Sequence, residues 1–117
     1  MKTAIRTVEQ LRKLVPSTPH CAHIQRGRVA VSNIIHLKDP RFLLFVGPCS
    51  IHDTEAGLEY ARKLASVQTI VGSEILLVMR TYLEKPRTVS GWTGLAYDPY
   101  LSQNGSANID TGLMISR

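Results

Sequence analysis

Residues 42–46 read Phe-Leu-Leu-Phe-Val, and residues 75–79 read Ile-Leu-Leu-Val-Met. Each run is apolar throughout, which is typical of a β-strand that is covered on both faces. The segment between them, residues 55–71, repeats apolar side chains at helical spacing. Strand, helix and strand in this order predict a βαβ unit, in which the strands are parallel and the crossover is right-handed.

The expected helix over residues 55–71 has recognisable ends. Asp53 or Thr54 is expected to cap its first turn, and Gly72 suits its termination. Its buried face is expected to carry Tyr60, Leu64 and Val67.

The amino-terminal part of the chain predicts two helices. Thr7 and Gln10 have the spacing of a capping box, which predicts a helix over residues 8–14. Thr18-Pro19 predicts the start of a second helix, over residues 19–37. The buried face of this second helix is expected to carry Val31, Ile34 and Ile35.

The part of the chain after the second strand is polar. Residues 81–108 contain several Pro and Gly residues and predict a long loop, and such loops are often functional. Trp92 is expected to pack this loop down, with stacking on a ligand as the alternative. Residues 109–117 predict the start of another helix. Because parallel strands need cover on both faces, these elements predict the opening of a larger α/β fold.

The composition excludes several classes of protein. The chain of 117 residues is 44% apolar and 20% charged, which predicts a folded core rather than disorder. Its longest apolar runs, residues 42–46 and 75–79, are far shorter than the ~18 residues of a membrane span. Residues 1–16 lack the apolar core of a signal peptide. Cys21 and Cys49 make no disulfide framework, so we expect a reduced, cytoplasmic protein.

The net charge of +5 is concentrated near the amino terminus. Residues 1–41 carry eight basic and two acidic side chains, whereas residues 42–117 carry six basic and seven acidic ones. We expect these basic side chains to lie on the solvated faces of the amino-terminal helices. Binding of nucleic acid or another polyanion by residues 1–41 is the alternative.

Reactive groups in parallel α/β folds collect at the carboxyl ends of the strands. The first strand is followed by Cys49 and His52. A thiolate and an imidazole suit a transition-metal site, and they also suit a nucleophile and its base. The structural alternatives are a packed thiol and a histidine in the turn before the helix.

The second strand is followed by three cationic side chains, Arg80, Lys85 and Arg87. Arg presents a planar fork and Lys a point charge, so together they favour binding of phosphate or carboxylate, to which Thr88 adds a hydroxyl. The alternative is a solvated loop in which Glu84 balances one charge. A charge placed directly behind a buried strand favours a cleft position for Arg80.

Two long motifs occur in a characteristic order. Residues 47–53 read Gly-Pro-Cys-Ser-Ile-His-Asp, residues 78–88 read Val-Met-Arg-Thr-Tyr-Leu-Glu-Lys-Pro-Arg-Thr, and Gly91-Trp92 follows. In these motifs the chain resembles the amino-terminal part of 3-deoxy-D-arabino-heptulosonate 7-phosphate (DAHP) synthase, of the bacterial type that aromatic amino acids regulate. The resemblance covers residues 7–117 and is tightest over residues 41–92.

The resemblance implies a fold. The family forms a (β/α)8, or TIM, barrel with an amino-terminal extension. Residues 1–40 would be that helical extension, and residues 41–117 would be the start of the barrel, ending in its first βαβ portion. A full-length enzyme would be a homodimer or homotetramer.

The resemblance also implies an activity. The family condenses phosphoenolpyruvate with erythrose 4-phosphate in the first step of the shikimate pathway, and it needs a divalent metal ion such as Mn, Fe, Co or Zn. Cys49 would be a metal ligand, and His52 and Lys85 would be catalytic. The substrate-binding residues would be Arg80 and Lys85 for phosphoenolpyruvate, and Lys85, Pro86, Arg87 and Thr88 for erythrose 4-phosphate.

The chain departs from the family at several positions. Leu83 stands where the family usually has Phe, Thr93 stands where it usually has Lys, and residues 100–108 replace a shorter acidic connection. Only one of four metal ligands falls within the chain, so we expect the isolated 117-residue chain to be inactive. The alternatives are a truncated product or a basic polyanion-binding module. For the enzyme, an aromatic amino acid is the expected inhibitor, with neither nucleic acid nor membrane as a partner.

Overall fold

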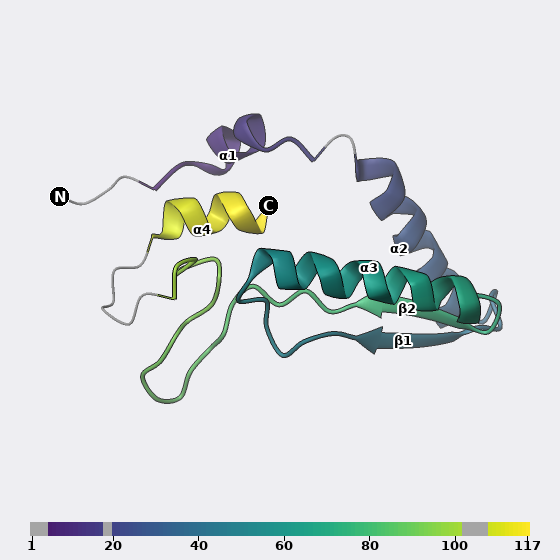
Figure 1. Ribbon diagram of the computed structural model, residues 1–117. Helices are drawn as coiled ribbons and strands as arrows, with labels where there is room; N and C mark the ends of the chain where they lie inside the picture. Colours follow the sequence, from purple (N-terminus) through teal and green to yellow (C-terminus); the bar gives the residue numbers. More distant parts are fainter. Residues whose placement is uncertain (1–4, 18–19, 102–107) are drawn as a thin grey trace. The chain divides into compact units, whose positions relative to one another are not determined.

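The computed structural model describes residues 5–17, 20–101 and 108–117. The elements in chain order are α1 (Val8–Leu14), α2 (Cys21–Ile35), β1 (Phe42–Val46), α3 (Thr54–Val71), β2 (Ile75–Met79) and α4 (Ile109–Ser116) (Figure 1). The chain divides into two compact units. We call residues 18–48 and 55–80 the βαβ unit, and residues 1–17, 49–54 and 81–117 the loop unit.

The two strands of the βαβ unit pair in parallel, with Phe42 opposite Ile75 and Val46 opposite Met79. The ladder continues beyond both ends of the sheet. The Phe42 N–H donates to the Glu74 carbonyl over 2.8 Å, and the Arg80 N–H donates to the Val46 carbonyl over 2.7 Å. The α/β class, both strand ranges and the parallel pairing predicted from the sequence are therefore confirmed.

Helix α3 presents a stripe of half-buried residues at intervals of three or four positions. These residues are Gly57, Ala61, Leu64, Gln68 and Val71. Of the face expected from the sequence, Leu64 is half-buried, but Tyr60 and Val67 are exposed, so the prediction was wrong for those two. The small residues and the Gln68 amide set this face, because Gln68 bonds to the backbone of β2.

The strands are less covered than the sequence predicts. Phe42 and Phe45 of β1 are 76% and 63% exposed, and β2 is only half-buried along its length. The expectation of a strand covered on both faces was wrong for this chain. The physical reason is that the described elements of this unit, two strands with α2 and α3, cannot enclose both faces of a sheet.

Arg41 ties the amino end of the sheet to the turn before β2. Its guanidinium donates to both carboxylate oxygens of Asp39 and to the Gly72 carbonyl, the last over 3.2 Å. The hydrogen bonds from the Arg41 side chain and backbone lower the pKa of the Asp39 carboxyl. The same pairing raises the pKa of Arg41.

The capping box of α1 is confirmed. The Gln10 N–H donates to Thr7 Oγ1 over 3.3 Å, and the Thr7 N–H donates to Gln10 Oε1 over 2.8 Å. Helix α2 is shorter than the predicted 19–37, and the expected cap at Thr18-Pro19 lies outside the described residues.

The expected buried face of α2 is only partly present. Val31 and Ile34 are half-buried, but Ile35 is 65% exposed, so that part of the prediction was wrong. Helix α2 contacts β1. A sheet of two strands covers only a narrow face of this helix and leaves Ile35 outside it.

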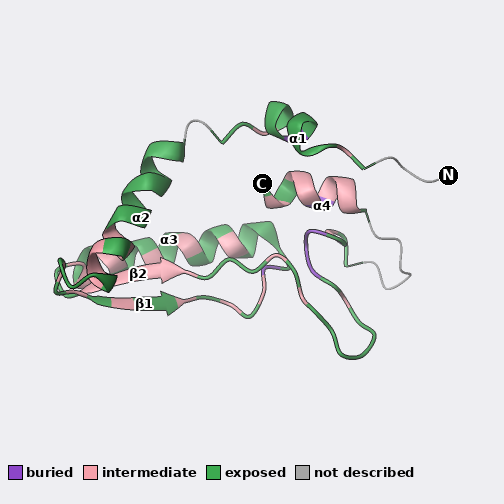
Figure 2. Ribbon diagram, turned by 180° about the vertical axis from the view of Figure 1, so that it is seen from behind, coloured by how far each residue is buried: buried purple, intermediate pink, exposed green. Residues whose placement is uncertain are grey.

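The loop unit holds every residue that the structure describes as buried, as Figure 2 shows in purple. These residues are Leu11, Ile51, Gly94, Leu95, Ala96, Asp98 and Gly112. Helix α4, predicted at residues 109–117, begins behind Asn108, whose side chain accepts from the Thr111 N–H over 3.1 Å. Its Gly112 packs so closely that a Cβ there would lie 2.3 Å from the Ala96 carbonyl oxygen.

The amino-terminal segment is tied to α4 by two arginines. Arg6 forms an ion pair with Asp110, and Arg117 Nε donates to the Val15 carbonyl over 2.6 Å. These contacts hold α1 and α4 within the same unit, although they are separated by most of the sequence.

Candidate anion-binding site

The carboxyl ends of β1 and β2 lie at the same edge of the sheet, because the strands are parallel. Gly47 and Arg80 follow those ends. A Cβ at Gly47 would lie 2.6 Å from the Arg80 carbonyl oxygen and 2.9 Å from its Cβ, so only glycine permits this approach. The Arg80 backbone is fixed at the end of the ladder, and its side chain is exposed within this chain. The cleft position expected for Arg80 stays a prediction.

A second juxtaposition lies within the loop unit, where residues 49–54 run beside residues 81–85. The buried Ile51 donates its N–H to the Tyr82 carbonyl over 2.8 Å. Lys85 Nζ donates to Cys49 Sγ over 3.3 Å. The structure therefore brings together two of the predicted site residues, the thiol and the central lysine.

The segment that carries Lys85 is itself braced by the end of the loop. The Lys85 N–H donates to the Thr93 carbonyl over 2.8 Å, and the Ala96 N–H donates to the Leu83 carbonyl over 3.1 Å. Gly94 makes this pairing possible. Its φ is +117°, and a Cβ would lie 2.5 Å from the Leu83 carbonyl oxygen.

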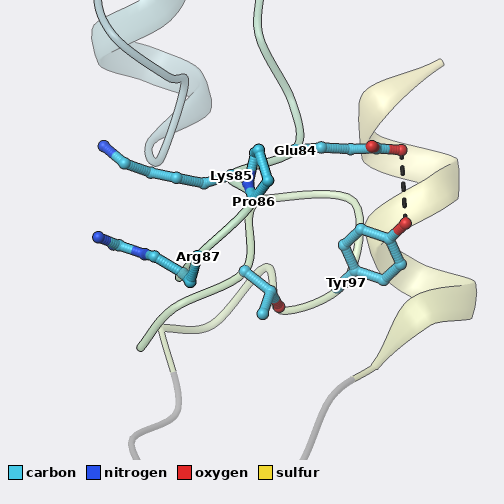
Figure 3. Close-up of a pocket in the computed structure, with 6 residues that line it drawn as sticks. Glu84, Lys85, Pro86, Arg87 and Tyr97 are labelled. Carbon is cyan, nitrogen blue, oxygen red and sulfur yellow. Dashed lines mark hydrogen bonds between the residues drawn. The ribbon is translucent and has the colours of Figure 1, made fainter. Parts of the chain in front are cut away.

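A pocket of about 340 Å³ lies along this braced segment. It is lined by Glu84, Lys85, Pro86, Arg87, Thr93 and Tyr97. Figure 3 shows Lys85 and Arg87 extending to one side and Glu84 and Tyr97 to the other, where Tyr97 Oη and Glu84 Oε1 are 3.5 Å apart. Two cations side by side, one with a planar fork, suit a phosphate or carboxylate.

The pocket differs from the sequence prediction in its membership. Pro86 and Arg87 line it as candidate substrate-binding residues, but Thr88 is exposed and is not among the lining residues. His52 is exposed, two residues before the start of α3. Sequence reasoning missed Tyr97 as a lining residue, because the spacing of tyrosines in a loop does not indicate which of them lines a pocket.

Trp92 donates its indole N–H to the Asp98 carbonyl over 2.8 Å and is half-buried. This agrees with the expectation that Trp92 packs the loop down. The Trp92 carbonyl in turn accepts from Arg87 Nε over 2.9 Å.

The donor set does not fit a metal ion by itself. Within residues 5–17, 20–101 and 108–117, no three His, Cys, Asp or Glu side chains come together as ligands. Cys49 offers one thiol, whereas zinc sites, for example, use three or four protein ligands. In the same described ranges, no helix has the length and apolar character needed to cross a bilayer.

These features define an α/β protein with a pocket that carries two cationic side chains, Lys85 and Arg87, in the loop after its second strand. More particularly, the chain belongs to the DAHP synthetase I family, whose model matches residues 11–116.

Several relatives show the extent of the match. The chain is 46% identical over 112 residues to the Tyr-sensitive phospho-2-dehydro-3-deoxyheptonate aldolase of Escherichia coli K12, a match that covers 95% of this chain and 31% of the relative. It is 45% identical to the Trp-sensitive enzyme of the same strain, covering 95% of this chain and 32% of the relative.

A solved structure agrees with this assignment. The structure of phospho-2-dehydro-3-deoxyheptonate aldolase from Francisella tularensis SCHU S4 matches with a TM-score of 0.90 and 39% identity. The match covers 100% of this chain and 34% of that one. The chain thus spans about a third of the length of the relatives it matches.

Proposed function

We propose that this chain contributes the phosphate-binding part of a DAHP synthase active site. The enzyme is a transferase that condenses phosphoenolpyruvate, erythrose 4-phosphate and water into DAHP and phosphate, at the entry to aromatic amino-acid biosynthesis. The observation that carries the proposal is the pocket in which Lys85 and Arg87 extend to the same side. Membership of the family supports the same reading.

Each cationic side chain has a proposed role that the resemblance to the family implies. Arg80 is proposed to bind phosphoenolpyruvate with its planar fork. Lys85 is proposed to bind the same substrate. Arg87 holds the phosphate of erythrose 4-phosphate, with Pro86 lining the pocket and Thr88 offering a hydroxyl.

Lys85 is proposed to contact both substrates. In the proposed reaction the methylene carbon of phosphoenolpyruvate bonds to the aldehyde carbon, water adds to the neighbouring carbon, and phosphate leaves. The aldehyde oxygen gains a proton in this process, and an ammonium group beside it is suited to donate one. Lys85 is proposed for this role, and His52 is proposed as a further catalytic group.

A divalent metal ion is proposed for the complete enzyme, with Cys49 as one ligand. Because the described residues supply no cluster of three ligands, no step of the reaction is assigned to the metal. We further propose that residues 41–117 begin a (β/α)8 barrel and that residues 1–40 extend it. The relatives named Tyr-sensitive and Trp-sensitive suggest an aromatic amino acid as the inhibitor.

The test is a titration of the chain with phosphoenolpyruvate, followed by isothermal calorimetry. Lys85→Ala should weaken binding about tenfold or more, since a charge-assisted contact contributes about 1.5–3 kcal/mol. Lys63→Ala is the matched control, because Lys63 lies on α3 and pairs with Glu59. Equal affinity of the two variants would contradict the proposed role of Lys85.

A further inference from the structure

The guanidinium of Arg87 is held in one orientation by a single backbone acceptor. Arg87 Nε donates to the Trp92 carbonyl over 2.9 Å. A guanidinium is planar, so a bond at Nε restricts the direction of the two terminal nitrogens without using either of them. Figure 3 shows this side chain extending to the same side as Lys85.

The acceptor is anchored in its turn. The Trp92 indole N–H donates to the Asp98 carbonyl over 2.8 Å, and Asp98 is only 8% exposed. Asp98 also accepts at Oδ1 from the Tyr100 N–H over 3.3 Å. The position of the Trp92 carbonyl is therefore tied to a buried residue of the loop.

Gly91 supplies the space that the guanidinium needs. A Cβ at Gly91 would lie 3.3 Å from Arg87 Nε and 3.6 Å from its Cζ. The first of these contacts is tighter than ordinary packing, so a side chain at this position would push Arg87 away from the Trp92 carbonyl.

We infer that Gly91, Trp92 and Asp98 form a brace that aims the Arg87 guanidinium at an anionic ligand of the pocket. The inference rests on the proposed function in taking that ligand to be a phosphate. Gly91 and Trp92 are positioning residues, because they act on the ligand through Arg87. The brace fixes the fork before the ligand arrives, which lowers the cost of ordering a long side chain on binding.

The test uses the ¹⁵N-labelled chain and inorganic phosphate as the probe. Trp92→Phe keeps an apolar ring and removes the indole N–H, and Tyr60→Phe on α3 is the matched control. In Trp92→Phe we expect faster solvent exchange of the Arg87 Nε–H, measured by NMR without phosphate. We also expect a phosphate Kd about threefold to tenfold higher, the range for losing one hydrogen bond. The control should change neither quantity.

A double-mutant cycle separates positioning from a merely structural role. In an Arg87→Ala background, Trp92→Phe should have no further effect on the phosphate Kd. If Trp92→Phe does not fold, Gly91→Ala replaces it in every measurement.

Two outcomes would overturn the inference. One is an unchanged Nε–H exchange rate in the brace variant, and the other is an undiminished effect on phosphate binding in the Arg87→Ala background. Failure of the proposed function looks different. In that case Arg87→Ala itself leaves phosphate binding unchanged, while the phosphate-free exchange rate still decides whether the brace orients Arg87.

Discussion

The βαβ unit and the loop unit differ in a way that reverses the usual expectation. The βαβ unit contains the regular sheet, yet none of its described residues is buried. The loop unit contains no strand in its described residues, yet it holds all the buried ones. Regular hydrogen bonding and burial are therefore separate properties here, and the pocket belongs to the unit that has the burial.

The interactions that stabilise the interior of each unit also differ. In the βαβ unit, backbone ladders and the side-chain amide of Gln68 satisfy the polar groups of the strands. In the loop unit, backbone packs directly on backbone at Gly94 and Gly112. The comparison predicts that the loop unit does not tolerate an added methyl group at Gly94 or Gly112, whereas the βαβ unit depends more on individual hydrogen bonds.

The largest expected effect is that of Gly112→Ala. The new Cβ would meet the Ala96 carbonyl oxygen at 2.3 Å and the Leu95 carbonyl oxygen at 2.6 Å, so helix α4 must move away. Overpacking of this kind should lower the free energy of unfolding by about 3 kcal/mol, measured by urea denaturation.

Gly27→Ala in α2 is the matched control in the βαβ unit. Nothing lies within 4 Å of a Cβ at Gly27, so alanine should raise stability by about 0.5–1 kcal/mol. If the two substitutions shifted stability in the same direction, the contrast between the units would be broken.

The next largest effect concerns the open edge of β2. The backbone groups of Glu74 and Arg80 form hydrogen bonds with β1. In a parallel pair the alternate residues point their N–H and C=O groups the other way, so those of Ile75 and Leu77 face away from β1. Gln68 Nε2 donates to the Ile75 carbonyl over 3.0 Å, and the Leu77 N–H donates to Gln68 Oε1 over 2.7 Å. The side-chain amide thus occupies the place of a neighbouring strand.

Gln68→Leu should remove both bonds and cost about 1–2 kcal/mol. Hydrogen exchange at the Leu77 amide should accelerate, while the Leu76 amide, which faces β1, should stay protected. Gln25→Leu on the exposed surface of α2 is the control. Unchanged protection at Leu77 would show that the amide does not cap this edge.

The sequence was sufficient where local rules decide the structure. Five consecutive apolar residues gave both strand ranges, and the Thr7–Gln10 spacing gave the bounds of α1. The parallel order of the strands also predicted that Cys49 and Lys85 come together, and Lys85 Nζ lies 3.3 Å from Cys49 Sγ. These features depend on periodicity, capping and parallel topology, all of which are visible in a short window.

The sequence was insufficient where distant backbone segments meet. Burial of Phe42 and Phe45 was overestimated, because an apolar run reports only that cover is needed. The pocket contribution of Tyr97 and the bond from Arg87 to the Trp92 carbonyl depend on how the loop folds back on itself. No spacing in the sequence specifies that path.

A smaller effect is expected at the cap of α1, a regular element of the loop unit. Thr7→Ala removes the acceptor of the Gln10 N–H and should cost about 1 kcal/mol. Thr69→Ala on α3 is the control, because Thr69 Oγ1 donates to the Ser66 carbonyl within its own helix and caps no helix end. A larger loss at Thr69 than at Thr7 would contradict the cap as the stabilising feature.

The smallest effect is a pH dependence at the amino end of the sheet. The hydrogen bonds from Arg41 lower the pKa of Asp39 in the folded chain, so the unfolded chain takes up a proton at Asp39 first as the pH falls. The stabilisation is complete above the unfolded pKa of about 3.9, and it is lost as the pH falls towards the lower folded value. Asp39→Asn should therefore be less stable than the parent chain at pH 6, and the difference should close as the pH falls through the lowered pKa of Asp39 in the folded chain. Glu59 is the comparison, since Lys63 also lowers its pKa, but its side chain is 64% exposed against 20% for Asp39. Solvent screens the more exposed pair, so Glu59→Gln should change the pH profile less. Thermal melts of the three chains from pH 2 to pH 7 measure this, and a parallel offset of Asp39→Asn at every pH would exclude the Asp39 carboxylate as its source.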